Sequence, residues 1–290
     1  MAKISKTIIK VYDRLKLDDK LDFSNIEDSI DRLEVIGKDL LAEIEKLGFD
    51  PSHRVYTDYQ NLLSVFEEEV TIHRDLKFYR KKESIYYRDY MPSYPPMSPI
   101  TSAYYAYWVS CDFQFGKDNE TINTIFSDVG KAEDFEEMIL NIGSNLHDSH
   151  MKFYRHMGFQ DGLIMLKDIM SDKMYLCKSN SGYEGSVGEI WFVRIVPNLD
   201  KVHDYYIIMT TPYVVLENSE NDWIMFFNRQ GIKKGDPEME IKYRDFMKNP
   251  PTPIYWLEYL AEAYVNYQPH NIRLTGIPDV PGSKPHELNN

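Results

Sequence analysis

Residues 151–216 read MKFYRHMGFQ DGLIMLKDIM SDKMYLCKSN SGYEGSVGEI WFVRIVPNLD KVHDYYIIMT TPYVVL. Short apolar and aromatic runs alternate here with Gly, Asn, Asp and Pro, a pattern typical of strands joined by tight turns. Asp161-Gly162 is a dipeptide favoured in two-residue hairpin turns. The stretch predicts six strands: Lys152–Met157, Leu163–Ile169, Lys173–Cys177, Glu189–Val196, Tyr205–Thr210 and Tyr213–Leu216. We therefore expect a small antiparallel β-barrel over residues 151–217.

Outside this stretch, apolar residues recur mostly at helical spacing. Ser24 and Glu27 have the spacing of a capping box, and Ser219 and Asp222 form a weaker one. The pattern predicts helices at 24–48, 52–80, 99–113, 121–129, 133–147, 219–231 and 253–267. Residues 231–251 are charged and are expected to be irregular. The tail after Pro269 is expected either to strap across the protein or to fray.

These elements indicate an α+β fold. An N-terminal helical region (1–150) precedes the small antiparallel β-barrel (151–217), and C-terminal helices with a tail (218–290) pack on the barrel. The sequence leaves open whether helices and barrel form one domain or two, because no flexible linker separates them.

Composition excludes several classes of protein. The chain of 290 residues is 43% hydrophobic and 27% charged, as expected of a soluble globular protein. Its net charge of −13 disfavours nucleic-acid binding, which needs a positive surface. No apolar stretch is long enough to cross a membrane, and the first residues lack the features of a secretory signal. Cys111 and Cys177, both in apolar runs, are too few for a disulfide framework and are expected to be buried thiols. With no expected signal or membrane span, the predicted location is cytoplasmic.

Motifs of catalysis are missing: the sequence contains no G-x-S-x-G nucleophile elbow, no phosphate-binding loop and no dinucleotide-binding glycine pattern. No catalytic residue and no cofactor is therefore predicted. His147, Asp148 and His150 carry ligand types that suit a transition metal. Through tertiary folding, Glu136, Glu137 or His73 could supply a third protein ligand. This supports an alternative function as a metal-dependent hydrolase or oxidoreductase. The same residues also fit a polar helix C-terminus, where histidine complements the helix dipole.

Aromatic residues are unusually frequent at 14%, and 22 of them are tyrosines. Tyrosine is enriched at interfaces because it buries a large area and keeps a polar group. The predicted partner-binding residues are Tyr86, Tyr87, Tyr90, Tyr94, Tyr104 and Tyr105. The preferred function is thus a non-enzymatic accessory protein that holds a protein or peptide partner. The same tyrosines would serve equally well as packing between helices and barrel.

A third hypothesis is RNA binding through the barrel, because small barrels stack bases on aromatic side chains. The candidate stacking residues are Tyr154, Tyr175, Tyr183 and Trp191. The net charge counts against this hypothesis. The sequence identifies neither the partner nor the oligomeric state.

Two segments resemble a small-barrel module of uncharacterised bacterial proteins, some of which carry the SEC-C zinc motif. They are Gly162–Ile169, with Leu166-Lys167-Asp168-Ile169 at its end, and Gly188–Pro197, which begins Gly-Glu-Ile. The resemblance covers about a quarter of the chain and implies a barrel fold. The zinc-binding cysteines of the SEC-C motif are missing here, so the resemblance implies no ligand site and no catalytic residue.

Overall fold

The computed structural model describes residues 2–18, 28, 30, 31, 50–71, 76, 79, 81, 83, 84, 99–179, 183–199, 204–209, 211–215, 219–248 and 272–274. The chain divides into two compact units. Unit 1 comprises Met1–Ile85 with Ala106–Asp148, and unit 2 comprises Tyr86–Tyr105 with Ser149–Asn290. Of the three boundaries, the second falls inside the helix Pro99–Cys111 and the third follows Asp148, two residues before the first strand. Each unit is described by itself.

Unit 1 is helical. Its elements are α1 (Lys3–Asp18), α4 (Pro51–Val70), the second half of α6 (Pro99–Cys111), α7 (Ile122–Ala132) and α8 (Glu137–Asp148). Asp50 caps α4 by accepting hydrogen bonds from the Ser52 and His53 amides, and Pro51 occupies the first turn, where its missing amide costs nothing. In the core, the Phe126 ring packs edge-on against Tyr59 and Phe66.

A polar pair is buried in this core. The Tyr59 hydroxyl donates to Asn123 Oδ1 at 2.9 Å, and Asn123 Nδ2 donates to the Gly143 carbonyl at 2.8 Å. A Cβ at Gly143 would lie 2.5 Å from the Tyr59 hydroxyl, so only glycine permits this approach. These two hydrogen bonds satisfy the Tyr59 hydroxyl and the Asn123 amide, which would be costly to bury without partners.

Helix α1 is absent from the predictions, which place the first helix at Ser24. It has no acidic residue in its first turn. Its N-terminal amides are instead capped from far along the chain: Glu120 accepts from the Ile4 and Ser5 amides, and Asp118 accepts from the Lys3 amide. Local sequence therefore lacked the usual sign of a helix start.

Unit 2 contains a seven-stranded sheet. Its strands are β1 (Met151–Gln160), β2 (Leu163–Asp168), β3 (Met174–Ser179), β4 (Ile190–Pro197), β5 (Tyr206–Ile208), β6 (Tyr213–Val215) and β7 (Ile272–Leu274). The first six confirm the predicted strands to within three residues at each end. The short strand β7 was not predicted and pairs antiparallel with β6. Asp161 and Gly162 have φ angles of 51° and 78°, as the predicted hairpin turn between β1 and β2 requires.

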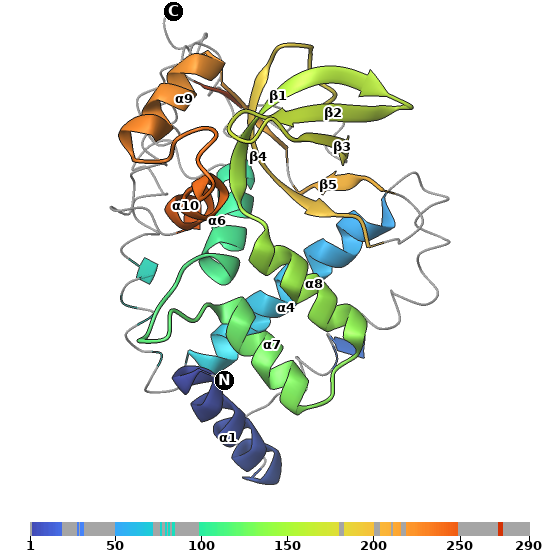
Figure 1. Cartoon of the computed structure of the whole chain (residues 1–290). Coiled ribbons are helices and arrows are strands. Elements are labelled where there is room, and N and C mark those ends of the chain that lie inside the picture. The colour runs from blue at the N-terminus through green and yellow to red at the C-terminus, as the bar shows by residue number, and fades with distance from the viewer. Residues whose placement is uncertain are drawn as a thin grey trace, which may run out of the picture. The chain divides into compact units, whose positions relative to one another are not determined.

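The strand order is β1-β2-β3-β5-β4-β6-β7, and an additional pairing of β1 with β4 closes the first five strands into a ring (Figure 1). The pairings within the ring are antiparallel except β3 with β5, which is parallel. The prediction of an antiparallel sheet is therefore wrong, and the sheet is mixed. The reason is parity: five strands cannot close a ring while every neighbour runs in the opposite direction. The α+β class is confirmed.

Helices α9 (Glu220–Arg229) and α10 (Met239–Lys248) complete the described part of unit 2 (Figure 1). The predicted Ser219–Asp222 capping box at the start of α9 is present. The Phe153 ring of β1 stacks on Trp223 of α9 at 4.0 Å and on Phe192 of β4 at 4.5 Å. These contacts make α9 a cover for the sheet.

Helix α10 contradicts the expectation that residues 231–251 are irregular. Its buried apolar and aromatic residues Met239, Tyr243, Phe246 and Met247 have the spacing of one helix face, and Lys248 at its end is buried as well. The charged residues between them cover the other face, and their number concealed the apolar pattern.

The predicted helices differ from the structure in length as well. Helix α4 ends at Val70 rather than near Arg80. At its end the Thr71 hydroxyl donates to the Glu68 carbonyl, a local bond that competes with the helix. Helix α6 (Pro99–Cys111) confirms the helix predicted to begin at Pro99. Of the predicted helix at 24–48 only residues 28, 30 and 31 are described, all helical, and the helix at 253–267 lies outside the described residues.

Candidate functional site

The β1–β2 hairpin carries the two groups of residues that are chemically most distinctive in unit 2. Strand β1 pairs with β2 from Tyr154 to Gln160 and with β4 from Met151 to Arg155. The half of the hairpin next to β4 is called its base, and the half that ends at the Asp161-Gly162 turn is called its distal end. A bulge between His156 and Gly158 separates the two halves.

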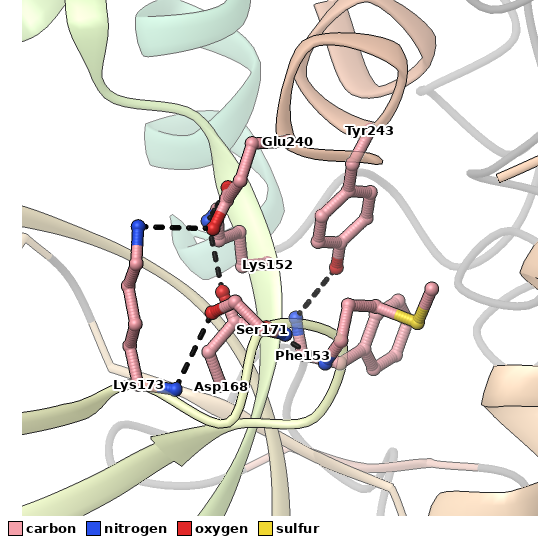
Figure 2. Close-up of polar contacts among 8 residues, drawn as sticks. Lys152, Phe153, Asp168, Ser171, Lys173, Glu240 and Tyr243 are labelled. Atoms are coloured by element: carbon pink, nitrogen blue, oxygen red, sulfur yellow. Dashed lines mark hydrogen bonds and ion pairs between the residues drawn. The ribbon is translucent and has the colours of Figure 1, made fainter. Parts of the chain in front are cut away.

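At the base lies an ion network, named the base network, formed by the buried Lys152 and Asp168, the half-buried Glu240 and the exposed Lys173. The Lys152 ammonium is 2.8 Å from Asp168 Oδ2 and 3.0 Å from Glu240 Oε2, and Lys173 reaches Glu240 Oε1 at 3.3 Å. Figure 2 shows Lys173 approaching Glu240 on the side away from Tyr243. Lys152 is 7% exposed and Asp168 is fully buried. The network therefore links β1, the end of β2 and helix α10.

Backbone groups complete the base network. The other oxygen of Asp168 accepts hydrogen bonds from the Met170 and Ser171 amides, at 2.8 and 3.2 Å. The Tyr243 hydroxyl of α10 accepts from the Phe153 amide at 3.1 Å, as Figure 2 shows. One oxygen of Asp168 thus fixes the turn between β2 and β3, while the other pairs with the Lys152 ammonium.

The electrostatic surroundings at the base favour the charged forms of Lys152 and Glu240. Burial opposes the charged form of Lys152, but the Asp168 and Glu240 carboxylates outweigh burial and raise its pKa. Burial likewise acts to raise the pKa of Glu240, but Lys152 and Lys173 lower it further than burial raises it. Burial and the Asp168 charge hold the pKa of Tyr243 well above its ordinary value. Lys152 therefore stays an ammonium and is unsuited to act as a nucleophile or base, so the geometry favours a structural link.

At the distal end, His156 fastens the segment 183–189 to the bulge. Its Nδ1 accepts a hydrogen bond from the Gly158 amide at 3.2 Å, so its Nε2 carries the proton and donates to the Glu184 carbonyl at 3.0 Å. The His156 backbone also bonds to Glu189 and Gly188. Burial lowers the pKa of His156, while the Glu184 carbonyl and the Glu189 carboxylate oppose the change. The neutral ring thus joins two segments that are 28 residues apart.

The Glu189 carboxylate holds the same segment from its other end. It accepts hydrogen bonds from the Tyr183 hydroxyl at 2.8 Å and from Trp191 Nε1 at 2.9 Å. Gly185 lies against the Trp191 ring, so that a Cβ there would be 2.3 Å from Trp191 Cζ2. Residues 183–189 are therefore positioned by specific contacts with β1 and β4.

Three large apolar side chains are exposed at the distal end: Met157 at 38%, Phe159 at 48% and Val187 at 71%. We call them the distal surface. A Cβ at Gly158 would lie 3.7 Å from Val187 Cγ2, so Val187 lies next to β1 at Gly158, the residue between Met157 and Phe159 in the chain. The Phe159 ring contacts His156, with the ring centres 5.2 Å apart. Exposed apolar side chains that gather in this way mark interaction sites.

The tyrosines predicted to bind a partner lie elsewhere. Tyr104 and Tyr105 are buried. The Tyr104 hydroxyl donates to the Thr211 carbonyl at 2.9 Å, and its ring stacks on Tyr213. Tyr86, Tyr87, Tyr90 and Tyr94 lie outside the described residues. A contact surface built from this group therefore stays a prediction that depends on those four.

The residues of the alternative metal site are placed in different surroundings. His147 and Asp148 are exposed at the end of α8, whereas His150 is buried with its ring edge-on to Tyr243. Among the described residues, no group of three or more His, Cys, Asp or Glu side chains is placed to hold a metal ion. His73, one of the three possible third ligands, lies outside that part of the chain.

Of the aromatic residues proposed to stack RNA bases, Tyr154 and Trp191 are buried in the sheet. Tyr175 and Tyr183 are half-buried, and the Tyr183 hydroxyl is bonded to Glu189. Both cysteines are buried and free, as predicted, and burial raises the pKa of the Cys177 thiol, which makes it unreactive.

Sequence reasoning missed both groups on the hairpin. Each ion pair of the base network joins residues at least 16 positions apart, so no local motif reveals the network. The distal surface had a signal in Phe159, an apolar residue two positions before the Asp161-Gly162 turn, where polar residues are expected. Comparisons with protein-family models, curated proteins and solved structures find no match. In the described part of the chain, the helices are too short or too polar to cross a membrane.

Proposed function

We propose that the chain is a non-enzymatic binding protein that holds a protein or peptide partner on the distal surface of the β1–β2 hairpin. The observation that carries this proposal is the exposure of Met157, Phe159 and Val187 together. They are three of the six exposed large apolar residues in the described part of the chain. A partner that covers them removes apolar area from water, which is the main source of affinity in most complexes.

The surroundings of the distal surface support binding over aggregation or disorder. His156, Glu189 and Trp191 fix the segment that carries Val187. A surface held rigid before binding loses less entropy when the partner arrives. The ring of strands below it also supports the proposal that unit 2 is built on a small barrel that serves as scaffold. The free, buried thiols agree with the proposed cytoplasmic location.

A displayed peptide library tests the proposal. The full chain is used to select binding peptides, and their affinities are compared for the wild type and the Phe159→Ser/Val187→Ser double variant. Both side chains are largely exposed, so these changes leave the fold intact. We expect at least about a tenfold loss of affinity, since central apolar contacts each contribute more than about 1 kcal/mol.

Met225→Ser is the matched control, because Met225 on α9 is similarly exposed at 51% but lies outside the distal surface. It is expected to leave the affinities unchanged. Peptides that bind the double variant as tightly as the wild type would contradict the proposal. So would a library that yields no binding peptide.

A further inference from the structure

The bulge in β1 is held by the side chain of His156. Met157 has no partner in the register with β2, so it is the extra residue of the bulge. Gly158 follows it with a φ angle of 113°, and the Gly158 amide donates to His156 Nδ1 at 3.2 Å. A bulge redirects the side chains beside it. The exposed positions of Met157 and Phe159 therefore depend on a hydrogen bond to one imidazole nitrogen.

The other nitrogen of the His156 ring binds the neighbouring segment of the distal surface. Nε2 donates to the Glu184 carbonyl at 3.0 Å. Val187, three residues further along, lies next to Gly158, since a Cβ there would be 3.7 Å from Val187 Cγ2. The Phe159 ring contacts the imidazole directly, with the ring centres 5.2 Å apart. One imidazole thus connects both parts of the chain that form the distal surface.

A proton on Nδ1 is incompatible with this arrangement. Because Nδ1 accepts from the Gly158 amide, its lone pair is already used, and a protonated ring would set two donors against each other. The ring is buried, and burial lowers the pKa of His156 below its ordinary value of about 6.5. The arrangement therefore requires the neutral ring and is disturbed in mild acid.

The groups that face His156 from neighbouring elements leave this conflict in place. Leu166 lies opposite it on β2, and Trp191 of β4 contacts its ring with the centres 5.2 Å apart, so both of these neighbours are uncharged. The Glu189 carboxylate, directly before β4, favours the protonated ring, as does the carbonyl bonded to Nε2. Both act to raise the pKa of His156, but burial outweighs them. Glu189 also accepts from the Tyr183 hydroxyl, which stays protonated in this pH range.

We propose that His156 switches the distal surface by protonation: a proton on Nδ1 breaks the hydrogen bond from the Gly158 amide, changes the bulge and lowers the affinity for the partner. The partner binds the arrangement that the neutral ring holds, in which Met157, Phe159 and Val187 are fixed. Its apparent affinity then falls with the fraction of chains that carry a neutral ring. This inference rests on the proposed function and specifies how pH regulates the same site.

Binding measured between pH 7.5 and 5 tests the switch. The probes are library peptides selected on the full chain at pH 7.5 that have blocked ends and lack histidine and acidic residues, so that they do not titrate. Their Kd values are measured by fluorescence anisotropy, and circular dichroism shows whether the fold is retained. We expect Kd to rise at least about threefold at pH 5, because only chains with a neutral His156 bind tightly.

NMR on the wild-type chain gives a second measurement, which applies even if a substitution at the buried His156 disturbs the fold. The Gly158 amide and the His156 ring are expected to titrate with the same midpoint. Saturating peptide is expected to move that midpoint to lower pH, because binding that favours the neutral ring opposes its protonation.

His156→Asn removes the titration and keeps an acceptor, since an asparagine side-chain oxygen commonly accepts from the amide two residues further on. We expect Kd in this variant to change by less than about 1.5-fold over the same pH range. His147→Asn is the matched control, because His147 is exposed at the end of α8 in unit 1. It is expected to keep the pH dependence of the wild type.

A Kd that is the same at both pH values, a Gly158 amide that does not follow the His156 ring, or a pH dependence that survives in His156→Asn would overturn the inference. The Phe159→Ser/Val187→Ser variant at pH 7.5 distinguishes failure of the proposed function. If it binds the peptides as tightly as the wild type, the distal surface is not the binding site. If it loses them while the wild-type Kd does not change with pH, only the switch is wrong.

Discussion

The base and the distal end of the β1–β2 hairpin differ in a way that local hydropathy does not explain. At the base, Lys152 and Asp168 are charged yet buried, and their charges are paired. At the distal end, Met157 and Phe159 are apolar yet exposed, and the neighbouring acid Asp161 has no ion-pair partner among the described residues. The same two strands carry both arrangements. What differs is the cover: β4 and α10 contact the base, and β4 no longer pairs with the strand beyond Arg155.

Two phenylalanines on β1 provide the most direct way to break this comparison. Phe153→Ala should lower the free energy of unfolding by about 3–5 kcal/mol, because its buried ring stacks on Trp223 and Phe192. Phe159→Ala, six residues further along, should change it by less than about 0.5 kcal/mol, because its ring is already half in water. Urea unfolding followed by circular dichroism measures both. Similar losses for the two variants would show that the distal ring is covered in solution.

Removing one charge from the base should have the next largest effect. Asp168→Asn keeps the oxygen that accepts from the Met170 and Ser171 amides but leaves Lys152 with Glu240 alone. We expect a loss of about 3 kcal/mol in unfolding free energy, since a buried charge loses its main partner. The Lys152→Met/Asp168→Asn variant should recover most of the loss. Glu184→Gln at the distal end should cost less than about 0.5 kcal/mol, and an equal cost for Asp168→Asn would refute the difference.

The fastening of the segment 183–189 is tested by two of its glycines. Gly185 and Gly188 both have positive φ angles, of 71° and 94°, so alanine strains the backbone at either position by about 1 kcal/mol or more. Only at Gly185 would the added Cβ also meet the Trp191 ring. Gly185→Ala should therefore cost about 2 kcal/mol and Gly188→Ala about 1 kcal/mol in thermal or urea unfolding. Equal costs would mean that Trp191 moves aside freely.

The two ends should also respond to acid at different pH. The pKa of His156 is lower in the folded state than in the unfolded state. As pH falls below about 6.5, the unfolded state therefore binds a proton first. The stability of the distal end against local unfolding decreases from that pH down to the folded pKa. The pKa of Glu240 is also lowered in the folded state. Because the carboxylate is stabilising only when it is charged, its contribution to the free energy of unfolding is full above the unfolded pKa of about 4.5 and is lost as pH falls from there through the folded pKa.

Hydrogen exchange, corrected for the intrinsic effect of pH, measures this difference. Protection at Gly158 and residues 184–189 should decline between pH 6.5 and 5, while protection at Phe153 is retained. In His156→Gln the decline over this pH range should disappear. A uniform decline at both ends would contradict the assignment of the distal response to His156.

Much of the fold was predictable from sequence because its signals are local. The six strands from β1 to β6, the Asp161-Gly162 turn and the Ser219–Asp222 capping box each depend on residues that are close together in the chain. The predictions were wrong where the structure depends on residues that are far apart in the chain. Helix α1 is capped by Asp118 and Glu120, and the parallel pairing of β3 with β5 follows from closure of the ring. Helix α10 buries one narrow face between many charges.

The candidate site was predictable only in part. The histidines and tyrosines that the sequence singled out were chosen by residue type, and burial was not visible: Tyr104 and His150 are both inside the fold. Phe159 lies beside a turn that was predicted correctly, but its exposure depends on where β4 stops pairing with β1.

The sequence by itself determined the α+β class, the strands of the sheet and the turn at the tip of the hairpin, because backbone preference and hydrophobic period act over a few residues. Tertiary structure alone decided which polar groups are buried and which apolar groups are exposed. Lys152 can be buried because Asp168 and Glu240 reach it from 16 and 88 residues away, and Phe159 is exposed because no described strand or helix covers it. Whether a side chain is buried depends on the surrounding fold, and the residue type alone does not determine it.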